Sequence, residues 1–253
     1  MNIDWNKIYA AIWRQRKAYL RPVHNIDAVS LSDLVGIDQQ KQKLVENTLR
    51  FINHKPANHA LLWGARGTGK SSLIKALLNE YMKDGLRLIE VDKTDLMYLP
   101  EIVDDIRDLP QWFILFCDDL SFETTETSYK ALKSVLEGSV ELPPNNVLLY
   151  ATSNRRHLVP EFMSDNLDTL HVGAELHYSD NIEEKISLSD RFGLCLSFYS
   201  ISQKEFLNIV DSYFSGYEYP REELHDAALK FSRERGARSG RTAKQFYNSY
   251  VSG

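Results

Sequence analysis

The chain has 253 residues and a formal net charge of −5, and 43% of its residues are hydrophobic while 26% are charged. These values are ordinary for a globular protein and exclude a disordered or low-complexity chain. The net acidity disfavours non-specific DNA binding by the molecule as a whole and leaves room only for a local basic patch. No apolar run approaches the length of a membrane span, so we expect no membrane insertion.

The first 30 residues are expected to form a helical extension. Four large apolar side chains recur at the spacing of one helix face, namely Trp5, Ile8, Tyr9 and Ile12. This spacing predicts an amphipathic helix that ends before Pro22. Such a face more often packs on the protein's own core than on a partner, and the sequence leaves that choice open.

The N-terminal residues do not resemble a secretion signal. Asp4 stands where a basic region is required, and no long apolar region follows. Cys117 and Cys195 lie within apolar runs rather than at metal-ligand spacing, which favours buried, reduced thiols. We therefore expect a cytoplasmic protein.

Predicted strands and helices alternate between residues 31 and 200. Apolar runs predict buried strands at 60–63, 112–117 and 147–152, and a further strand is predicted at 86–91. Periodic segments predict helices at 41–53, 72–78, 100–109 and 127–136. This alternation is typical of a three-layer α/β domain in which a parallel sheet lies between two layers of helices.

The remaining segments have a different character. Residues 165–187 are polar and poorly periodic, and we expect them to form a surface insertion without metal-ligand spacing. Residues 201–253 have helical patterns at 203–213, 222–233 and 242–250, separated by glycine and proline. They predict a small helical domain after the α/β core.

The segment after the strand at 60–63 matches the phosphate-binding P-loop at every position. It comprises Gly64, Ala65, Arg66, Gly67, Thr68, Gly69, Lys70 and Ser71, with Ser72 next in the following helix. Glycines let backbone N–H groups close around a triphosphate, and the helix N-terminus adds the positive end of its dipole. Lys70 can reach the β- and γ-phosphate oxygens, and the Ser71 hydroxyl can complete the shell of Mg²⁺. The sequence therefore predicts a nucleoside triphosphate site.

Polar side chains follow two of the predicted strands. Asp118 and Asp119 come directly after the strand at 112–117, and Asn154 follows the strand at 147–152. Ligands of parallel sheets bind at the carboxyl ends of the strands, where a carboxylate can hold Mg²⁺ and a polar group can orient water. If the two strands are neighbours, Asn154 faces the γ-phosphate. The alternative is a solvated acidic pair at a strand end.

These segments together resemble an AAA+ ATPase over nearly the whole chain. More narrowly, the sequences at 116–123 (Phe-Cys-Asp-Asp-Leu-Ser-Phe-Glu) and 187–194 (Ser-Leu-Ser-Asp-Arg-Phe-Gly-Leu) are similar to the bacterial AAA+ family catalogued as domain of unknown function 815. The resemblance implies ATP and Mg²⁺ as ligands, a helical lid, and assembly of copies into a ring or partial ring. It also implies an unidentified protein or nucleic-acid partner.

The resemblance implies roles for individual residues. Val35, Gly36 and Ile37 match the adenine pocket, and Lys70 and Ser71 match the Walker A pair. Asp118 and Asp119 match Walker B, and Asn154 matches sensor 1. Arg191 is similar to the arginine finger that acts on a neighbouring subunit, and Arg241 is similar to the sensor 2 arginine of the lid. An always-charged guanidinium can neutralise charge that develops on the γ-phosphoryl oxygens. The alternatives are a surface ion pair with Asp190 for Arg191 and a solvated helix start for Arg241.

One position departs from the AAA+ pattern, because Walker B motifs usually end in Asp-Glu and here the second acid is Asp119. The shorter side chain ends roughly 1.5 Å short of the usual reach, and small misplacements cost orders of magnitude in rate. Three explanations stay open: a different backbone at Asp119, a contribution from Glu123, or slow hydrolysis.

Two classes of function therefore stay open. The first is an ATP hydrolase that remodels a protein or nucleic-acid partner, and Arg191, Arg241 and Asn154 favour it. The second is a slow or non-hydrolysing nucleotide-gated switch, which Asp119 favours. A small-molecule kinase does not account for the helical tail.

Two further features bear on the partner. Residues 97–99 (Met-Tyr-Leu) stand where a pore loop would lie, although such residues more often pack against the following helix. Basic residues follow sensor 1 at Arg155 and Arg156 and recur in the lid, where we expect nucleotide and subunit contacts rather than nucleic acid.

Overall fold

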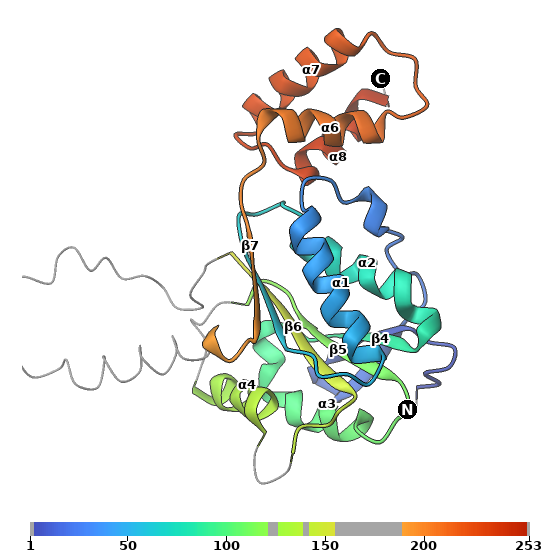
Figure 1. Cartoon of the computed structure of the whole chain (residues 1–253), viewed down its shortest axis with the longest axis vertical. Helices are drawn as coiled ribbons and strands as arrows, with labels where there is room; N and C mark the ends of the chain where they lie inside the picture. The colour runs from blue at the N-terminus through green and yellow to red at the C-terminus, as the bar shows by residue number, and fades with distance from the viewer. Residues whose placement is uncertain (1–2, 121–125, 139–141, 155–188, 252–253) are drawn as a thin grey trace, which may run out of the picture.

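The computed structural model describes residues 3–120, 126–138, 142–154 and 189–251, and within them the strands form one seven-stranded sheet (Figure 1). The strands are β1 Ala10–Arg14, β2 Tyr19–Val23, β3 Ala60–Gly64, β4 Leu86–Glu90, β5 Trp112–Cys117, β6 Val147–Ser153 and β7 Leu194–Phe198. Their order is β2-β1-β4-β5-β6-β3-β7. All neighbours are parallel except β1 and β2, which form an antiparallel hairpin.

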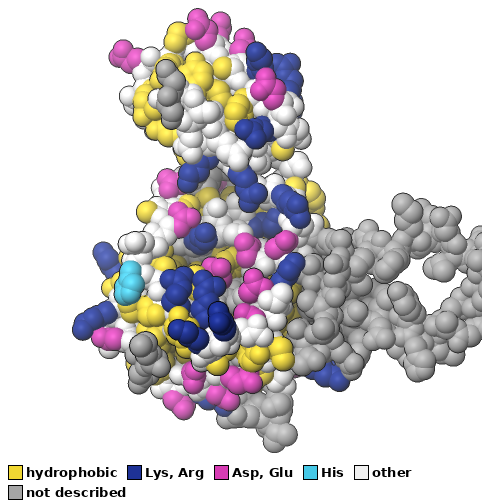
Figure 2. Space-filling model, turned by 180° about the vertical axis from the view of Figure 1, so that it is seen from behind, with side chains coloured by type: hydrophobic (Ala, Val, Ile, Leu, Met, Phe, Trp, Pro, Cys, Tyr) yellow, Lys and Arg dark blue, Asp and Glu magenta, His cyan; other side chains and the backbone are white. Residues whose placement is uncertain are grey.

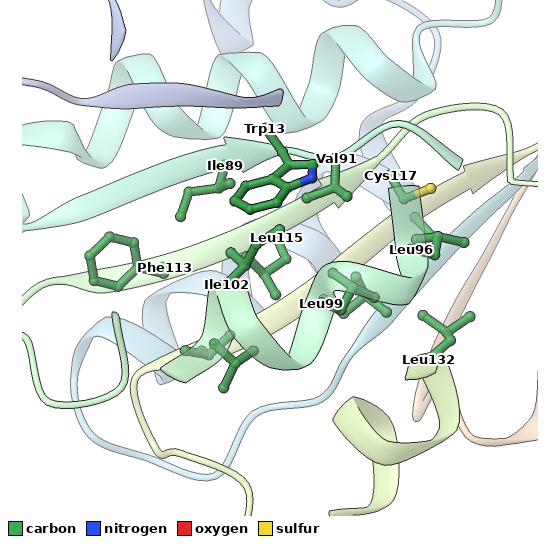
Figure 3. Close-up of a cluster of buried hydrophobic side chains, with 14 of the residues drawn as sticks. Trp13, Ile89, Val91, Leu96, Leu99, Ile102, Phe113, Leu115, Cys117 and Leu132 are labelled. Carbon is green, nitrogen blue, oxygen red and sulfur yellow. The ribbon is translucent and has the colours of Figure 1, made fainter. Parts of the chain in front are cut away.

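The helices of the core cover both faces of this sheet. They are α1 Asp38–Ile52, α2 Lys70–Tyr81, α3 Leu99–Ile106 and α4 Glu126–Glu137. Alternation along β5 serves both layers: Leu115 packs with α3 and α4, whereas Phe116 packs with α1 and α2. Figure 3 shows the first of these layers, in which Leu99 and Ile102 of α3 lie against the sheet. The three-layer α/β prediction is confirmed.

The predicted N-terminal helix is wrong. The chain forms β1, a turn over Gln15–Lys17 and then β2, and this hairpin extends the sheet beyond β4. Trp13 is 5% exposed and Trp5 is 6% exposed, so both are core residues. Of the four apolar residues with helical spacing only Ile12 lies in β1, so the spacing was coincidental, and the edge of β4 provided backbone hydrogen-bond partners for a strand. Pro22 lies in the edge strand β2, where a missing N–H is tolerated.

A seventh strand and the exposure of one cysteine differ from the sequence-based predictions. β7 joins the sheet beside β3, although no strand is predicted there, and Cys195 within it is exposed rather than buried. Residues 165–187 lie outside the described residues.

The three C-terminal helices form a separate small layer at one end of the molecule (Figure 1). They are α6 Gln203–Tyr213, α7 Arg221–Glu234 and α8 Gly240–Val251, close to their predicted bounds. Ser202 begins α6 with a capping box, since its hydroxyl accepts from the Glu205 amide and the Glu205 carboxylate accepts from the Ser202 amide. The helices enclose their own core, which includes Phe206, Val210 and Phe246. The described part of the chain contains no helix long and apolar enough to span a membrane.

Candidate nucleotide site

The P-loop connects β3 to α2 and is held by backbone conformations that favour glycine. Gly64, Gly67 and Gly69 have φ values of +130°, +73° and +95°. A Cβ at Gly64 would lie 1.9 Å from the carbonyl oxygen of Phe198 in β7, so no other residue fits there. Because α2 begins at Lys70, its first amides face the loop.

Lys70 lies within this loop and is 7% exposed. Its Nζ donates to the carbonyl oxygens of Gly64 at 2.8 Å and Ala65 at 2.7 Å. Burial lowers the pKa of Lys70, while the carboxylates of Asp118 and Asp119 act in the opposite direction. The ammonium group is therefore held by two carbonyl oxygens of the loop, and the charges of the acidic pair favour its protonated form.

Asp118 follows β5 and meets the start of α2. Its Oδ1 accepts from the Ser71 hydroxyl at 2.6 Å and from the Thr152 hydroxyl at 2.5 Å. A hydroxyl and a carboxylate oxygen at this distance fit Mg²⁺, which takes one or two protein oxygens and completes its shell with phosphate and water. In the described residues there is no group of three or more His, Cys, Asp or Glu that could hold a metal ion.

Asp119 has a left-handed backbone, with φ of +53°. Its amide donates to the Thr152 hydroxyl at 2.9 Å, and its carboxylate accepts from Nδ2 of Asn154. β6 lies beside β5, as the expectation for Asn154 required. An αL residue other than Gly costs about 1 kcal/mol or more and persists only where its surroundings hold it. Here Thr152 and Asn154 hold it, and the different backbone at Asp119 is one of the three explanations left open above.

Thr152 was missed by sequence reasoning. It is 2% exposed and joins both Walker B carboxyl residues, since it donates to Asp118 and accepts from Asp119. Its signal is a hydroxyl at the carboxyl end of a buried strand, and that signal becomes specific only once β6 is known to neighbour β5.

A cleft of about 700 Å³ lies between the core and the helical lid, within the usual range for ligand pockets. The expected site residues that line it are Val35, Ile37, Arg66, Gly67, Thr68, Gly69, Lys70, Ser71, Ser72, Asp118, Asp119, Asn154 and Arg241. Gly36 lies between two of them in the chain, with φ of +81°, and Gly64 and Ala65 lie beneath the loop as the acceptors of Lys70.

The cleft also has apolar lining residues. They include Leu34, Val35 and Ile37 of the core and Ile209 and Tyr213 of α6. The lid residues Ile209, Tyr213 and Lys244 were also missed by sequence reasoning, because only the fold brings α6 and α8 to the P-loop.

The lid touches the P-loop directly. The amide of Gly240, the first residue of α8, donates to the carbonyl oxygen of Gly67 at 3.1 Å. A Cβ at Gly67 would lie 2.8 Å from Ser239, so glycine permits this contact. The start of α8 is therefore in direct contact with the loop that would hold the phosphates.

Arg191 is not part of this cleft. Arg191 precedes β7, which is parallel to β3, so it lies near the amino ends of these strands, whereas the P-loop follows the carboxyl end of β3. Its Nε pairs with Glu137 at the end of α4 rather than with Asp190. A role for Arg191 within its own chain's site does not fit this position, whereas a role at a neighbour's site does. Glu123, Arg155 and Arg156 lie outside the described residues.

The residues at 97–99 pack against the core. Leu99 is fully buried, and the Tyr98 ring lies 5.6 Å from the Trp13 ring and accepts a hydrogen bond from Gln15 at 3.2 Å. The packing alternative accounts for this segment, with only Met97 well exposed, at 39%.

The sheet order, the P-loop between β3 and α2, and the helical lid define an AAA+ P-loop fold. A model of the protein family of unknown function DUF815 matches residues 6–253, and the chain belongs to that family. Two structures of Thermotoga maritima RuvB variants share the fold, with 16% identity, a TM-score of 0.60 and coverage of 88% of this chain for one, and 15%, 0.54 and 87% for the other. This chain spans 65% of the first RuvB chain and 72% of the second.

A shorter sequence similarity joins these. The replication factor C large subunit of Staphylothermus marinus is 35% identical over 66 residues, which are 26% of this chain and 15% of that protein.

Proposed function

We propose that the chain binds ATP with Mg²⁺ in the cleft between core and lid, hydrolyses it, and uses the cycle to remodel a partner. The observation that carries the proposal is the meeting of Lys70, Ser71, Asp118 and Arg241 in one cleft. Lys70 and the α2 N-terminus suit the phosphates, and Ser71 with Asp118 suits Mg²⁺. The apolar lining residues of the cleft suit adenine.

In this proposal Asp119 is the base that orients water, with Asn154 beside it. The left-handed backbone at Asp119 changes the direction of its short carboxylate, so the missing methylene need not abolish hydrolysis. The competing function is a slow nucleotide-gated switch. The hydrogen bond from Asn154 to the Asp119 carboxylate favours the switch if it keeps that carboxylate from orienting water.

Arg191 extends the proposal to assembly. Its place outside its own cleft supports a role as a finger for the next copy in a ring or partial ring. The RuvB structures and the replication factor C subunit support the AAA+ class, and the partner of this chain is open to protein or nucleic acid. Action in the cytoplasm stays a prediction of the sequence.

The test is steady-state ATP hydrolysis over a protein dilution series, with Lys70→Ala, Arg191→Ala and Asp119→Asn alongside. We expect a specific rate that rises with protein concentration and is lost in all three variants, while Asp119→Asn still binds ATP. A near-zero rate in the wild type, with tight ATP binding lost only in Lys70→Ala, would establish the switch instead.

A further inference from the structure

A cluster of cations lies on the N-terminal hairpin, apart from the nucleotide cleft. We call Arg14, Arg16, Lys17 and Arg21 the basic hairpin cluster. All four are exposed, and none makes an ion pair with another described residue. Figure 2 shows Lys and Arg side chains gathered on the core below the lid, on the face turned away in Figure 1. In a chain of net charge −5 such a local excess is not part of a generally basic surface.

The strand register adds an aromatic ring to these charges. Tyr19 lies opposite Arg14, and Arg21 lies opposite Ile12 two positions further along the pair. Residues opposite each other, and residues two apart, point to the same face of a sheet. Tyr19, which is half-buried, therefore shares one face of the hairpin with Arg14 across the strand pair and with Arg21 two residues along its own strand.

The hairpin is a fixed platform rather than a mobile tail. Ala11 and Trp13, on its other face, are 1% and 5% exposed, and β1 also pairs with β4. Gln15 in the turn donates to the Tyr98 hydroxyl at 3.2 Å. Because β1 is parallel to β4, the turn lies at the carboxyl-end edge of the sheet, the edge that carries the P-loop.

Acidic groups nearby compensate this charge only in part. Glu90 lies beside Ile12 on the same face of the sheet. The pKa of Asp92 is lowered mainly by its hydrogen bonds from Thr94 and to a smaller degree by the charges of Lys93 and Arg14. Arg14 is thus shared with Asp92 and with Asp95, whose pKa is raised by burial although the charge of Arg14 acts to lower it, and the excess resides chiefly on the other three members of the cluster.

We propose that this face of the hairpin binds single-stranded nucleic acid. The cations would contact successive phosphates, and Tyr19 would stack on a base; cationic grooves with aromatic platforms bind single strands in this way. A membrane surface is the poorer fit, since no large apolar side chain is exposed between residues 10 and 23.

This inference rests on the proposed function in one respect: it names the class of partner on which the proposed ATPase would act. Binding is measured without ATP, so loss of hydrolysis would leave this result intact, and loss of nucleic-acid binding would leave the ATPase proposal standing.

The test is fluorescence anisotropy of a labelled oligothymidylate of roughly 20 nucleotides, longer than the site size of one module, titrated with the full chain at several salt concentrations. The double variant Arg16→Ala, Lys17→Ala should reduce the slope of log K against log salt by about 1.4, at about 0.7 for each cation. The matched control removes two exposed lid cations, Arg233→Ala with Arg238→Ala, and should keep the wild-type slope.

Tyr19 tests the stacking step separately. Tyr19→Ser should weaken binding roughly 5- to 150-fold, and Tyr19→Phe should bind as the wild type does. Circular dichroism and thermal midpoints ensure that each variant is folded. The proposal is overturned if the wild type does not bind the oligonucleotide or binds only phosphatidylserine vesicles. It is equally overturned if the lid control loses as much slope, or if both Tyr19 variants bind alike.

Discussion

Replacing Thr152 by valine removes one hydroxyl and almost no volume, at the point where two acidic residues are held together. In the wild type that hydroxyl donates to Asp118 and accepts from the Asp119 amide. A hydrogen bond to a charged group contributes about 1.5–3 kcal/mol when buried, but water can replace this one because Asp118 is exposed. The Asp119 amide, by contrast, loses its partner next to a buried side chain. We expect the free energy of unfolding to fall by about 1–2 kcal/mol.

The functional effect of Thr152→Val should exceed this loss of stability. Asp118 would lose its orientation toward Ser71, and the left-handed turn at Asp119 would lose one of its two supports. We expect ATP to bind in the absence of Mg²⁺ as in the wild type, while the Mg²⁺ concentration required for half-maximal binding or turnover rises roughly tenfold.

The assays are urea unfolding and nucleotide binding over a Mg²⁺ titration, with Thr152→Ser as the control. Serine keeps the hydroxyl, so its Mg²⁺ requirement should stay near that of the wild type. Unchanged Mg²⁺ dependence in the valine variant would refute the positioning role that the two hydrogen bonds indicate.

Three further predictions concern the pH dependence of stability, the P-loop contact with Ser239 and the role of Arg191. Burial lowers the pKa of His59 to about 4 from its ordinary 6.5, so the unfolded chain binds the proton first, and stability present above pH 6.5 is lost as the pH falls toward 4. Between about pH 7 and about pH 4.5 the wild type should lose about 2 kcal/mol of unfolding free energy through His59, as measured by urea unfolding at the two pH values. His59→Gln should lack this part of the pH dependence, and an equal loss of unfolding free energy in the variant would contradict the prediction. Gly67→Ala should weaken ATP binding through its left-handed φ and its collision with Ser239, and Ser239→Gly should restore part of the affinity unless strain alone is responsible. Arg191→Ala, inactive alone, should recover hydrolysis when mixed with an excess of Lys70→Ala chains, because those neighbours supply the arginine to its intact nucleotide site; its rate per chain should approach that of wild type in the same mixture, and no recovery would exclude a role at the neighbouring site.

Local sequence was sufficient wherever a single segment determines its own structure. β5 has its predicted bounds because a run of six apolar residues between polar ends fits only a strand buried on both faces. α6 likewise has its predicted bounds, since Ser202 and Glu205 mark its start. The P-loop was predicted in full because each position has its own chemical requirement.

Sequence reasoning failed where pairing between distant segments decides. The N-terminal hairpin depends on the edge of β4, 78 residues further on by the Ala10–Leu88 pairing, and no local pattern reports that edge. In α1 the apolar side chain of Leu49 is 37% exposed while Phe51 is buried, because the sheet beneath the helix decides which apolar residues are covered. Thr152 depends in the same way on the order of strands.

The hairpin also determines how copies of the chain can meet. β2 ends the sheet, and a strand that tried to continue it would find no N–H at Pro22 and an arginine beside it. Growth of a shared sheet from this side is blocked, which protects the chain against fibre-like stacking. If copies of the chain assemble, their contacts would therefore involve surfaces other than β2, such as the helices and the lid. Contacts of that kind allow neighbouring copies to rotate relative to one another, whereas a continuous shared sheet would fix their orientation.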